Sequence, residues 1–177
     1  GVGGVHEAGE DAGRPYLALE LVEGESRQRL LDRGGPFEPR RAAELVLSLA
    51  EAMAHVHELG ILHRDLKPEN VLLDQQSRPR ITDFGLARDE QARALTRTGA
   101  LLGTPSFMAP EQAAGEPVGV ATDVYGLGAT LYSLLTGHPP FEGPSSVKVV
   151  TAVLPKPPAP PGQLRPGLDR QLEAICL

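Results

Sequence analysis

The stretch His63-Arg64-Asp65-Leu66-Lys67-Pro68-Glu69-Asn70 decides how this sequence is interpreted. It brings a carboxylate, two cationic side chains and a carboxamide into one short polar segment. Asp65 can accept a proton from an attacking hydroxyl group, and Lys67 can neutralise charge on a transferred phosphoryl group. Taken by themselves, these residue types still favour a plain polar loop that is capped by its own Asp and Asn side chains.

An acidic motif, Asp83-Phe84-Gly85, begins thirteen residues after Asn70. The side chains of Asn70 and Asp83 supply hard oxygen ligands, which suit Mg²⁺ when phosphates and water complete its coordination. Phosphoryl transfer depends mainly on positioning and electrostatics, so a base, a cation and a metal site are the parts that it needs. The two motifs together make phosphoryl transfer the alternative to the plain loop.

Two long helices are predicted on either side of these motifs. The first covers residues 39–59, where apolar residues recur at helical spacing: Ala42, Leu45, Val46, Leu49, Met53 and Val56. The second covers residues 121–136 and has one apolar side: Val124, Leu127, Leu131, Leu134 and Leu135. Gly126 and Gly128 each cost about 1 kcal/mol of helix propensity inside the second helix, which predicts that another segment packs closely there.

The rest of the pattern predicts short strands, shorter helices and loops. A strand is expected at 16–22 after a turn-like segment at 9–15, and a small hairpin at 71–73 and 80–82. The other segments are an exposed polar loop at 86–104, a short helix at 144–154, an extended surface connector at 155–166 and the start of a helix at 169–177. The expected fold class is mainly α with a few short β-strands.

The composition excludes several classes of function. With 41% hydrophobic and 23% charged residues, the chain is composed like an ordinary globular protein. A net charge of −6 argues against nucleic-acid binding, which needs a basic face. Cys176 is the single cysteine, so no internal disulfide is possible, and no apolar run is long enough to span a bilayer. We therefore expect a cytoplasmic location, no nucleic acid and no membrane segment in this sequence, with any transmembrane anchor of the whole protein outside it.

Four motifs, in order along the chain, resemble those of the protein kinase family. His63-Arg64-Asp65, with four residues before Asn70, is similar to the kinase catalytic loop, and Asp83-Phe84-Gly85 is similar to the metal-binding motif. Ala109-Pro110-Glu111 resembles the end of the activation segment, and residues 123–128 resemble the start of the central helix of the C-terminal lobe. The Lys67 loop resembles serine/threonine rather than tyrosine kinases, and the excess of Arg over Lys resembles bacterial, eukaryotic-like (Hanks-type) members.

The resemblance also implies a division of the chain. Residues 1–26 would be a remnant of the N-terminal lobe, with its strands 4 and 5 and the hinge. Residues 27–177 would be the C-terminal lobe, truncated before its last helices. The fold implied is thus a kinase-like C-terminal lobe with most of the N-terminal lobe absent.

The resemblance implies catalytic and metal-binding roles. Asp65 would orient or deprotonate the substrate hydroxyl, and Lys67 would contact the γ-phosphate of ATP. Asn70 and Asp83 would hold Mg²⁺, for which Mn²⁺ is an alternative. The reaction implied is transfer of the γ-phosphoryl group of ATP to Ser or Thr hydroxyls of a protein substrate.

Other residues would support this site without reacting. By the same resemblance, His63 would pack against the metal-binding motif and Asp123 would brace the backbone of the loop. Glu111 would pair with an arginine beyond Leu177.

Nucleotide binding is expected at the hinge. Residues 16–22 resemble the fifth strand running into the hinge. The implied contacts are Leu19 as gatekeeper, the backbone of Glu20 and Val22 against the adenine edge, Ser26 at the ribose and Leu73 as the floor under the base.

Regulation is a hypothesis based on Arg64, which precedes Asp65. In this arrangement, a phosphorylated residue of the activation segment supplies an anion for the arginine. Thr96 and Thr98 are the candidates, with self-association as the route to their phosphorylation. Solvated loop hydroxyls are the alternative interpretation.

A kinase also needs a Gly-rich loop and a strand lysine that pairs with the α- and β-phosphates. The lysines of this sequence are Lys67, Lys148 and Lys156, and none precedes the hinge. We therefore expect the chain alone to be inactive or nearly so. A pseudokinase or scaffold that only binds, and a small-molecule phosphotransferase of kinase-like fold, are the alternatives.

Overall fold

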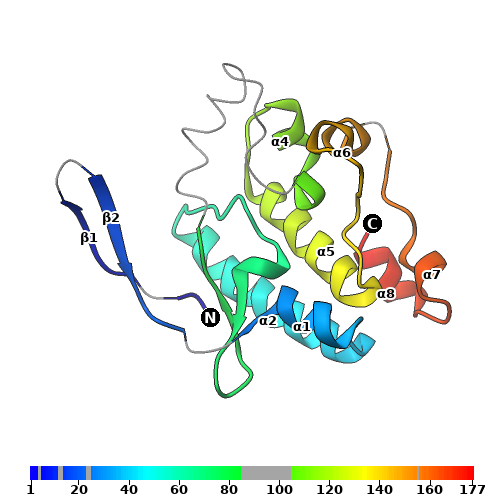
Figure 1. Ribbon diagram of the computed structural model, residues 1–177, viewed down its shortest axis with the longest axis horizontal. Coiled ribbons are helices and arrows are strands. Elements are labelled where there is room, and N and C mark those ends of the chain that lie inside the picture. The colour runs from blue at the N-terminus through cyan, green and yellow to red at the C-terminus, as the bar shows by residue number, and fades with distance from the viewer. Residues whose placement is uncertain (4, 12–13, 23–24, 85–104, 155) are drawn as a thin grey trace.

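The computed structural model describes residues 1–177 except 4, 12–13, 23–24, 85–104 and 155. The described part is a helical body from which one β-hairpin projects (Figure 1). This agrees with the predicted fold class, mainly α with a few short strands. The predicted loop at 86–104 lies wholly outside the described residues.

Two helices, α2 (Pro39–Glu58) and α5 (Val120–Thr136), form the centre of the body (Figure 1). Both lie within one residue of their predicted bounds. The carboxylate of Glu38 caps α2 by accepting hydrogen bonds from the backbone N–H groups of Arg40 and Arg41. Gly137, at φ 80°, ends α5 in the left-handed conformation that glycine adopts readily. The predicted apolar residues of α2 are all buried against α5 in one core: Ala42, Leu45, Val46, Leu49, Met53 and Val56.

Helix α1 (Arg27–Gly34) was not predicted, because its sequence carries only two adjacent leucines and no helical repeat. Ser26 begins it as the N-cap, and Leu31 anchors it in the core. Arg27, at its first position, is 2% exposed and stacks on the Phe37 ring, with its Cζ 4.9 Å from the ring centroid. Burial and the nearby Arg41 lower the pKa of Arg27 to about 10.

A three-stranded antiparallel sheet lies beside α1, in the order β3-β4-β5. Its strands are β3 (Glu25–Ser26), β4 (Val71–Leu73) and β5 (Pro79–Ile81). The hairpin of β4 and β5 was predicted, and its second strand begins one residue earlier than expected. Ser26 pairs with Leu72 and Glu25 with Leu73. The sheet therefore joins a strand that precedes α1 in the sequence to strands that follow α2.

The projecting hairpin consists of β1 (Val5–Asp11) and β2 (Arg14–Leu19). The turn-like segment predicted at 9–15 is wrong, because Gly9 to Asp11 belong to β1 and pair with Tyr16 to Arg14. Gly9 fits because a Cβ there would lie 2.7 Å from the Tyr16 ring, so the ring occupies the space of the missing side chain. The predicted strand at 16–22 ends at Leu19.

Shorter helices complete the described chain. They are the 3₁₀ turns η1 (Pro68–Asn70) and η2 (Pro105–Phe107), and the helices α4 (Pro110–Ala114), α6 (Ser146–Val153), α7 (Pro161–Leu164) and α8 (Arg170–Ile175). The prediction of an extended connector at 155–166 is wrong at α7, where Pro161 is buried and begins a single helical turn. Arg165 holds this segment in place by donating to the carbonyl oxygens of Phe37 and Leu135. In the described part of the chain, no helix is long and apolar enough to cross a membrane.

Candidate active site

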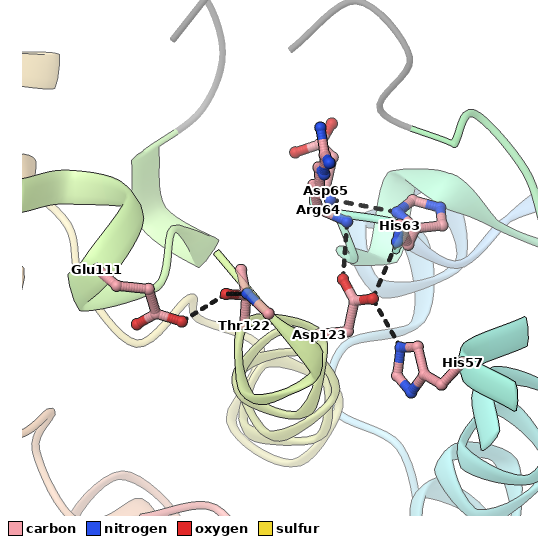
Figure 2. A network of polar contacts seen from close by, with 8 residues as sticks. His57, His63, Arg64, Asp65, Glu111, Thr122 and Asp123 are labelled. Carbon is pink, nitrogen blue, oxygen red and sulfur yellow. Dashed lines mark hydrogen bonds and ion pairs between the residues drawn. The ribbon is translucent and has the colours of Figure 1, made fainter. Parts of the chain in front are cut away.

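The 63–70 loop lies between the end of α2 and strand β4, and α5 holds it from below (Figure 2). Leu66 is buried against α5, where a Cβ on Gly126 would lie 2.8 Å from the Leu66 Cβ. The predicted close packing at Gly126 is therefore confirmed. Gly128 differs, since a Cβ there would meet only the Ile175 carbonyl oxygen, at 3.8 Å.

Asp123, on the first turn of α5, fixes the backbone of the loop (Figure 2). Its Oδ2 accepts from the backbone N–H of His63 at 2.9 Å, and its Oδ1 accepts from that of Arg64 at 2.7 Å. The Nε2 of His57 on α2 lies 2.8 Å from Oδ2 and donates a third hydrogen bond. The carboxylate is 1% exposed, and these three donors compensate its burial. The bracing role expected for Asp123 is confirmed.

His63 is a fully buried part of the scaffold and not a base facing solvent. Its Nδ1 accepts from the backbone N–H of Asp65 at 3.2 Å, so Nε2 carries the proton and donates to the Thr82 carbonyl at 3.0 Å. Burial lowers the pKa of the imidazole, which favours this neutral form. The ring also packs on Phe84, with ring centroids 4.6 Å apart, as the sequence predicted.

Asp65, Lys67 and Asn70 form one polar cluster on the loop. The Nζ of Lys67 lies 3.1 Å from the Asp65 Oδ2. The Nδ2 of Asn70 donates to the Asp65 backbone carbonyl at 2.8 Å and to its Oδ2 at 3.2 Å. The side chains of Asp65 and Lys67 are 21% and 14% exposed, so the cluster is held in place yet open to a substrate. A carboxylate and an ammonium arranged in this way can bind a hydroxyl group and an anionic group side by side.

Asp83 follows strand β5 close to Asn70. The backbone N–H of Thr82 donates to the Asn70 carbonyl at 2.9 Å, and Asp83 is the next residue. Asp83 is exposed and has φ 58°, a left-handed backbone that is uncommon for a residue with a side chain. Because Nδ2 of Asn70 is bound to Asp65, its Oδ1 is directed away from that carboxylate.

The donor set of Asn70 and Asp83 fits magnesium. One carboxylate and one carboxamide oxygen are the hard ligands that Mg²⁺ takes when substrate phosphates and water supply the rest. Among the described residues, no group of three or more His, Cys, Asp or Glu side chains could hold a metal ion alone. A metal at this place would therefore depend on phosphate oxygens as well.

The residues expected around the nucleotide base lie along the segment from β2 to β4. Leu73 is buried in β4 and pairs with Glu25, so the expected floor residue adjoins the end of the segment expected to be the hinge. The Oγ of Ser26 accepts weakly from the Arg29 backbone N–H, at 3.4 Å, as the cap of α1. Glu20 is exposed and Val22 is half-buried, whereas the side chain of Leu19 lies outside what the structure describes.

A polar hollow of about 280 Å³ lies beside this segment. Its walls are Glu20, Leu21 and Val22 together with residues 74–76 and 78 of the β4–β5 turn and residue 80 of β5. It includes none of the loop residues Asp65, Lys67 and Asn70, so it is separate from the polar cluster.

Helix α4 connects the loop to α5. The Glu111 Oε1 accepts from the Thr122 hydroxyl at 2.6 Å (Figure 2), and the Nε2 of Gln112 donates to the Arg64 carbonyl at 2.8 Å. Sequence reasoning missed His57, Gln112 and Thr122. Only the position of Thr122, directly before Asp123, gave any signal. The phosphorylation candidates Thr96 and Thr98 lie outside the described residues.

A family model and several curated relatives match this sequence, and both comparisons indicate the same family. The family model described as "Protein kinase domain" matches residues 4–156. The serine/threonine-protein kinases PknB of Mycolicibacterium smegmatis and of Mycobacterium tuberculosis are each 38% identical over 165 residues, covering 92% of this chain and 26% of each relative. A probable serine/threonine-protein kinase of Corynebacterium efficiens is 37% identical over 169 residues, again covering 92% and 26%. The chain thus spans about a quarter of the length of the curated relatives it matches.

Proposed function

The chain belongs to the protein kinase family, with bacterial Hanks-type serine/threonine kinases as its relatives, and from this premise we propose the activity of the protein that contains it. That protein transfers the γ-phosphoryl group of ATP to Ser or Thr hydroxyls of protein substrates. The observation that carries the proposal is the cluster of Asp65, Lys67 and Asn70, with Lys67 Nζ 3.1 Å from the Asp65 carboxylate.

The proposed mechanism assigns one task to each side chain. Asp65 binds the substrate hydroxyl, orients its oxygen for attack and accepts its proton as the new P–O bond forms, while the bond from the γ-phosphorus to the β–γ bridging oxygen breaks and ADP leaves. Lys67 neutralises charge on the transferred phosphoryl group, and Asn70 keeps the Asp65 carboxylate in place through the hydrogen bond from Nδ2. Asn70 and Asp83 would hold Mg²⁺, which when bound neutralises charge on the phosphates.

The proposed nucleotide site lies beside this cluster. Leu73 forms the floor under the adenine, the backbone of Glu20 and Val22 faces its edge, Leu19 is the gatekeeper and Ser26 contacts the ribose. The pairing of Ser26 with Leu72 supports this arrangement, since it puts the end of the hinge next to the strand that carries Leu73.

The division of the chain is part of the proposal. Residues 1–26 belong to the N-terminal lobe and the hinge, and residues 27–177 belong to the C-terminal lobe. The separation of the β1–β2 hairpin, which ends at Leu19, from the helical body in Figure 1 supports a division of the chain after this hairpin. Self-association of the whole protein would allow phosphorylation of Thr96 or Thr98.

The proposal is tested on the protein that contains this chain. We expect transfer of labelled phosphate from ATP·Mg to Ser- or Thr-containing peptides, and a fall in kcat of about 10²–10⁴-fold for Asp65→Asn. Asp32→Asn, which changes an exposed carboxylate on α1, is the matched control and keeps the wild-type rate.

Two outcomes would contradict the proposal. Nucleotide binding without transfer to any acceptor would indicate a pseudokinase or scaffold. Transfer to a small molecule, with none to peptides, would indicate a phosphotransferase of another substrate class.

A further inference from the structure

Gln112 joins two segments that lie far apart in the sequence. It is on α4, and its Oε1 accepts from the backbone N–H of Ala109 at 3.1 Å, which caps that helix. Its Nε2 donates to the backbone carbonyl of Arg64 at 2.8 Å, across 48 residues of sequence. One carboxamide therefore connects the start of α4 to the residue directly before Asp65.

Arg64 is held in an uncommon backbone conformation. Its φ is 66°, in the left-handed region where a residue with a side chain is strained. Both of its backbone polar groups are bound: the N–H to Asp123 Oδ1 at 2.7 Å and the carbonyl to Gln112 Nε2 at 2.8 Å. Such a conformation persists where the surroundings fix it from several sides.

The bond to the Arg64 carbonyl acts directly on Asp65. That carbonyl and the Asp65 N–H belong to the same planar peptide group. Gln112 holds the oxygen of this plane, and His63 Nδ1 accepts from its N–H at 3.2 Å. The orientation of the plane sets where the Cα of Asp65 lies, and this atom carries the side chain that ends in the carboxylate.

The support from Gln112 is itself anchored. Its neighbour Glu111 accepts a hydrogen bond from the Thr122 hydroxyl at 2.6 Å (Figure 2). Thr122 directly precedes Asp123, whose carboxylate binds the backbone of the loop. The contacts close a ring: α4 to α5 through Glu111, α5 to the loop through Asp123, and the loop back to α4 through Gln112. These three contacts link α4 and α5 to the peptide before Asp65.

We propose that Gln112 is a positioning residue, which acts through the Arg64 carbonyl to hold the Asp65 carboxylate in its reactive orientation. It does not touch the substrate. The inference rests on the proposed function of Asp65, but the contact itself can be tested without any activity.

Two substitutions separate the two hydrogen bonds of Gln112. Gln112→Glu keeps an oxygen for the Ala109 N–H but puts a carboxylate oxygen against the Arg64 carbonyl in place of the donor. Gln112→Lys keeps a donor for that carbonyl and loses the cap acceptor. Gln171→Glu, on an exposed residue of α8, controls for the added negative charge.

Kinetics on the protein that contains this chain give the first measurement. We expect Gln112→Glu to lower kcat about 10–100-fold, while KM for ATP changes less than about 2-fold, because the reacting geometry is lost and not the binding. Gln112→Lys is expected to stay within about 3-fold of the wild-type kcat. Losses of kcat and of thermal stability in Gln112→Lys, with Gln112→Glu at wild-type values, would show that Gln112 only caps α4.

Amide hydrogen exchange on the 177-residue chain gives the second measurement. Gln112→Glu is expected to speed exchange at Arg64 and Asp65 at least about 10-fold, with the interior of α2 unchanged. Wild-type exchange in this variant would overturn the inference. If the wild-type protein transfers no phosphate but the exchange result holds, the proposed function fails and the positioning contact stands.

Discussion

At the scale of single residues, His63 shows how burial decides what a titratable side chain can do. Both of its ring nitrogens are occupied, one by the Asp65 N–H and one by the Thr82 carbonyl. Because both nitrogens of the His63 imidazole are hydrogen-bonded to the backbone, the ring has a structural role and cannot exchange protons with a substrate. The base proposed for the reaction is instead the adjacent, partly open carboxylate of Asp65.

The lowered pKa of His63 predicts a pH dependence of folding. Burial dominates the shift and is opposed by the Thr82 carbonyl and by the charges of Asp123, Asp65 and Asp83. Below the ordinary histidine pKa of about 6.5, the unfolded chain therefore binds a proton that the folded chain does not. The free energy of unfolding contributed by His63 is fully present above that pH and falls as the pH drops towards the lowered pKa of the folded state.

Denaturant unfolding between pH 7.5 and 5.5 measures this effect. The His63→Gln variant should lose less stability over this interval than the wild type, by up to about 1.4 kcal/mol per pH unit. The exposed His138→Gln variant is the control for removing an imidazole. Identical pH profiles for the wild type and His63→Gln would contradict the assignment.

At the scale of elements, the contact between α5 and the 63–70 loop determines how closely the site is supported. Gly126 allows Leu66 to pack directly on the helix, whereas Gly128 faces open space apart from the Ile175 carbonyl. The two glycines stand two residues apart on one helix, so they experience the same helix propensity but different packing.

Alanine substitution of these glycines should give opposite results. Gly126→Ala puts a Cβ 2.8 Å from the Leu66 Cβ, and we expect it to destabilise the fold by about 1–3 kcal/mol. Gly128→Ala meets its nearest atom at 3.8 Å, so the gain in helix propensity should stabilise by about 0.5–1 kcal/mol. Guanidinium unfolding of the two variants distinguishes the effects, and a destabilised Gly128→Ala would refute this account of α5.

The elements also show what the sequence can predict. Apolar periodicity predicts α2 and α5 within one residue of their bounds because both bury one continuous face. It misses α1, because this helix is held by the Ser26 cap and a single buried leucine and has no apolar repeat. It also misreads β1, because Gly9 and Asp11 are typical turn residues.

The candidate site was predictable to the extent that its residues are adjacent in the sequence. Asp65, Lys67 and Asn70 lie within one loop, so their proximity followed from the motif. His57 and Gln112 were missed because their partners lie 66 and 48 residues away, and only the packing of helices brings them together. Side chains that bridge distant segments leave no periodic signal.

At the scale of the whole molecule, the described chain has a well-packed helical body and a thin N-terminal part. The β1–β2 hairpin has only its own two strands to pair with in the described residues. Two-stranded hairpins are marginally stable alone, so this part would add little rigidity to the proposed nucleotide site.

We expect the 177-residue chain on its own to bind ATP·Mg weakly and to have negligible turnover. No lysine precedes residue 67, so the proposed hinge and the residues before it supply no lysine for the α- and β-phosphates. Titration calorimetry should give a dissociation constant for ATP·Mg at least about 100-fold weaker than that of the protein that contains the chain. If the chain alone turned over ATP as fast as the protein that contains it, this expectation would be contradicted.

The bracing of the loop by Asp123 has a consequence for the order in which the protein is made. Asp123 follows His63 by 60 residues, and ribosomes add about 5–20 residues per second, so about 3–12 s separate their synthesis. During that interval the emerging chain already contains Asp65, Lys67 and Asn70 but lacks the carboxylate that binds the backbone of His63 and Arg64. The hydrogen bonds that hold the start of the proposed catalytic loop can thus form only after α5 has been translated.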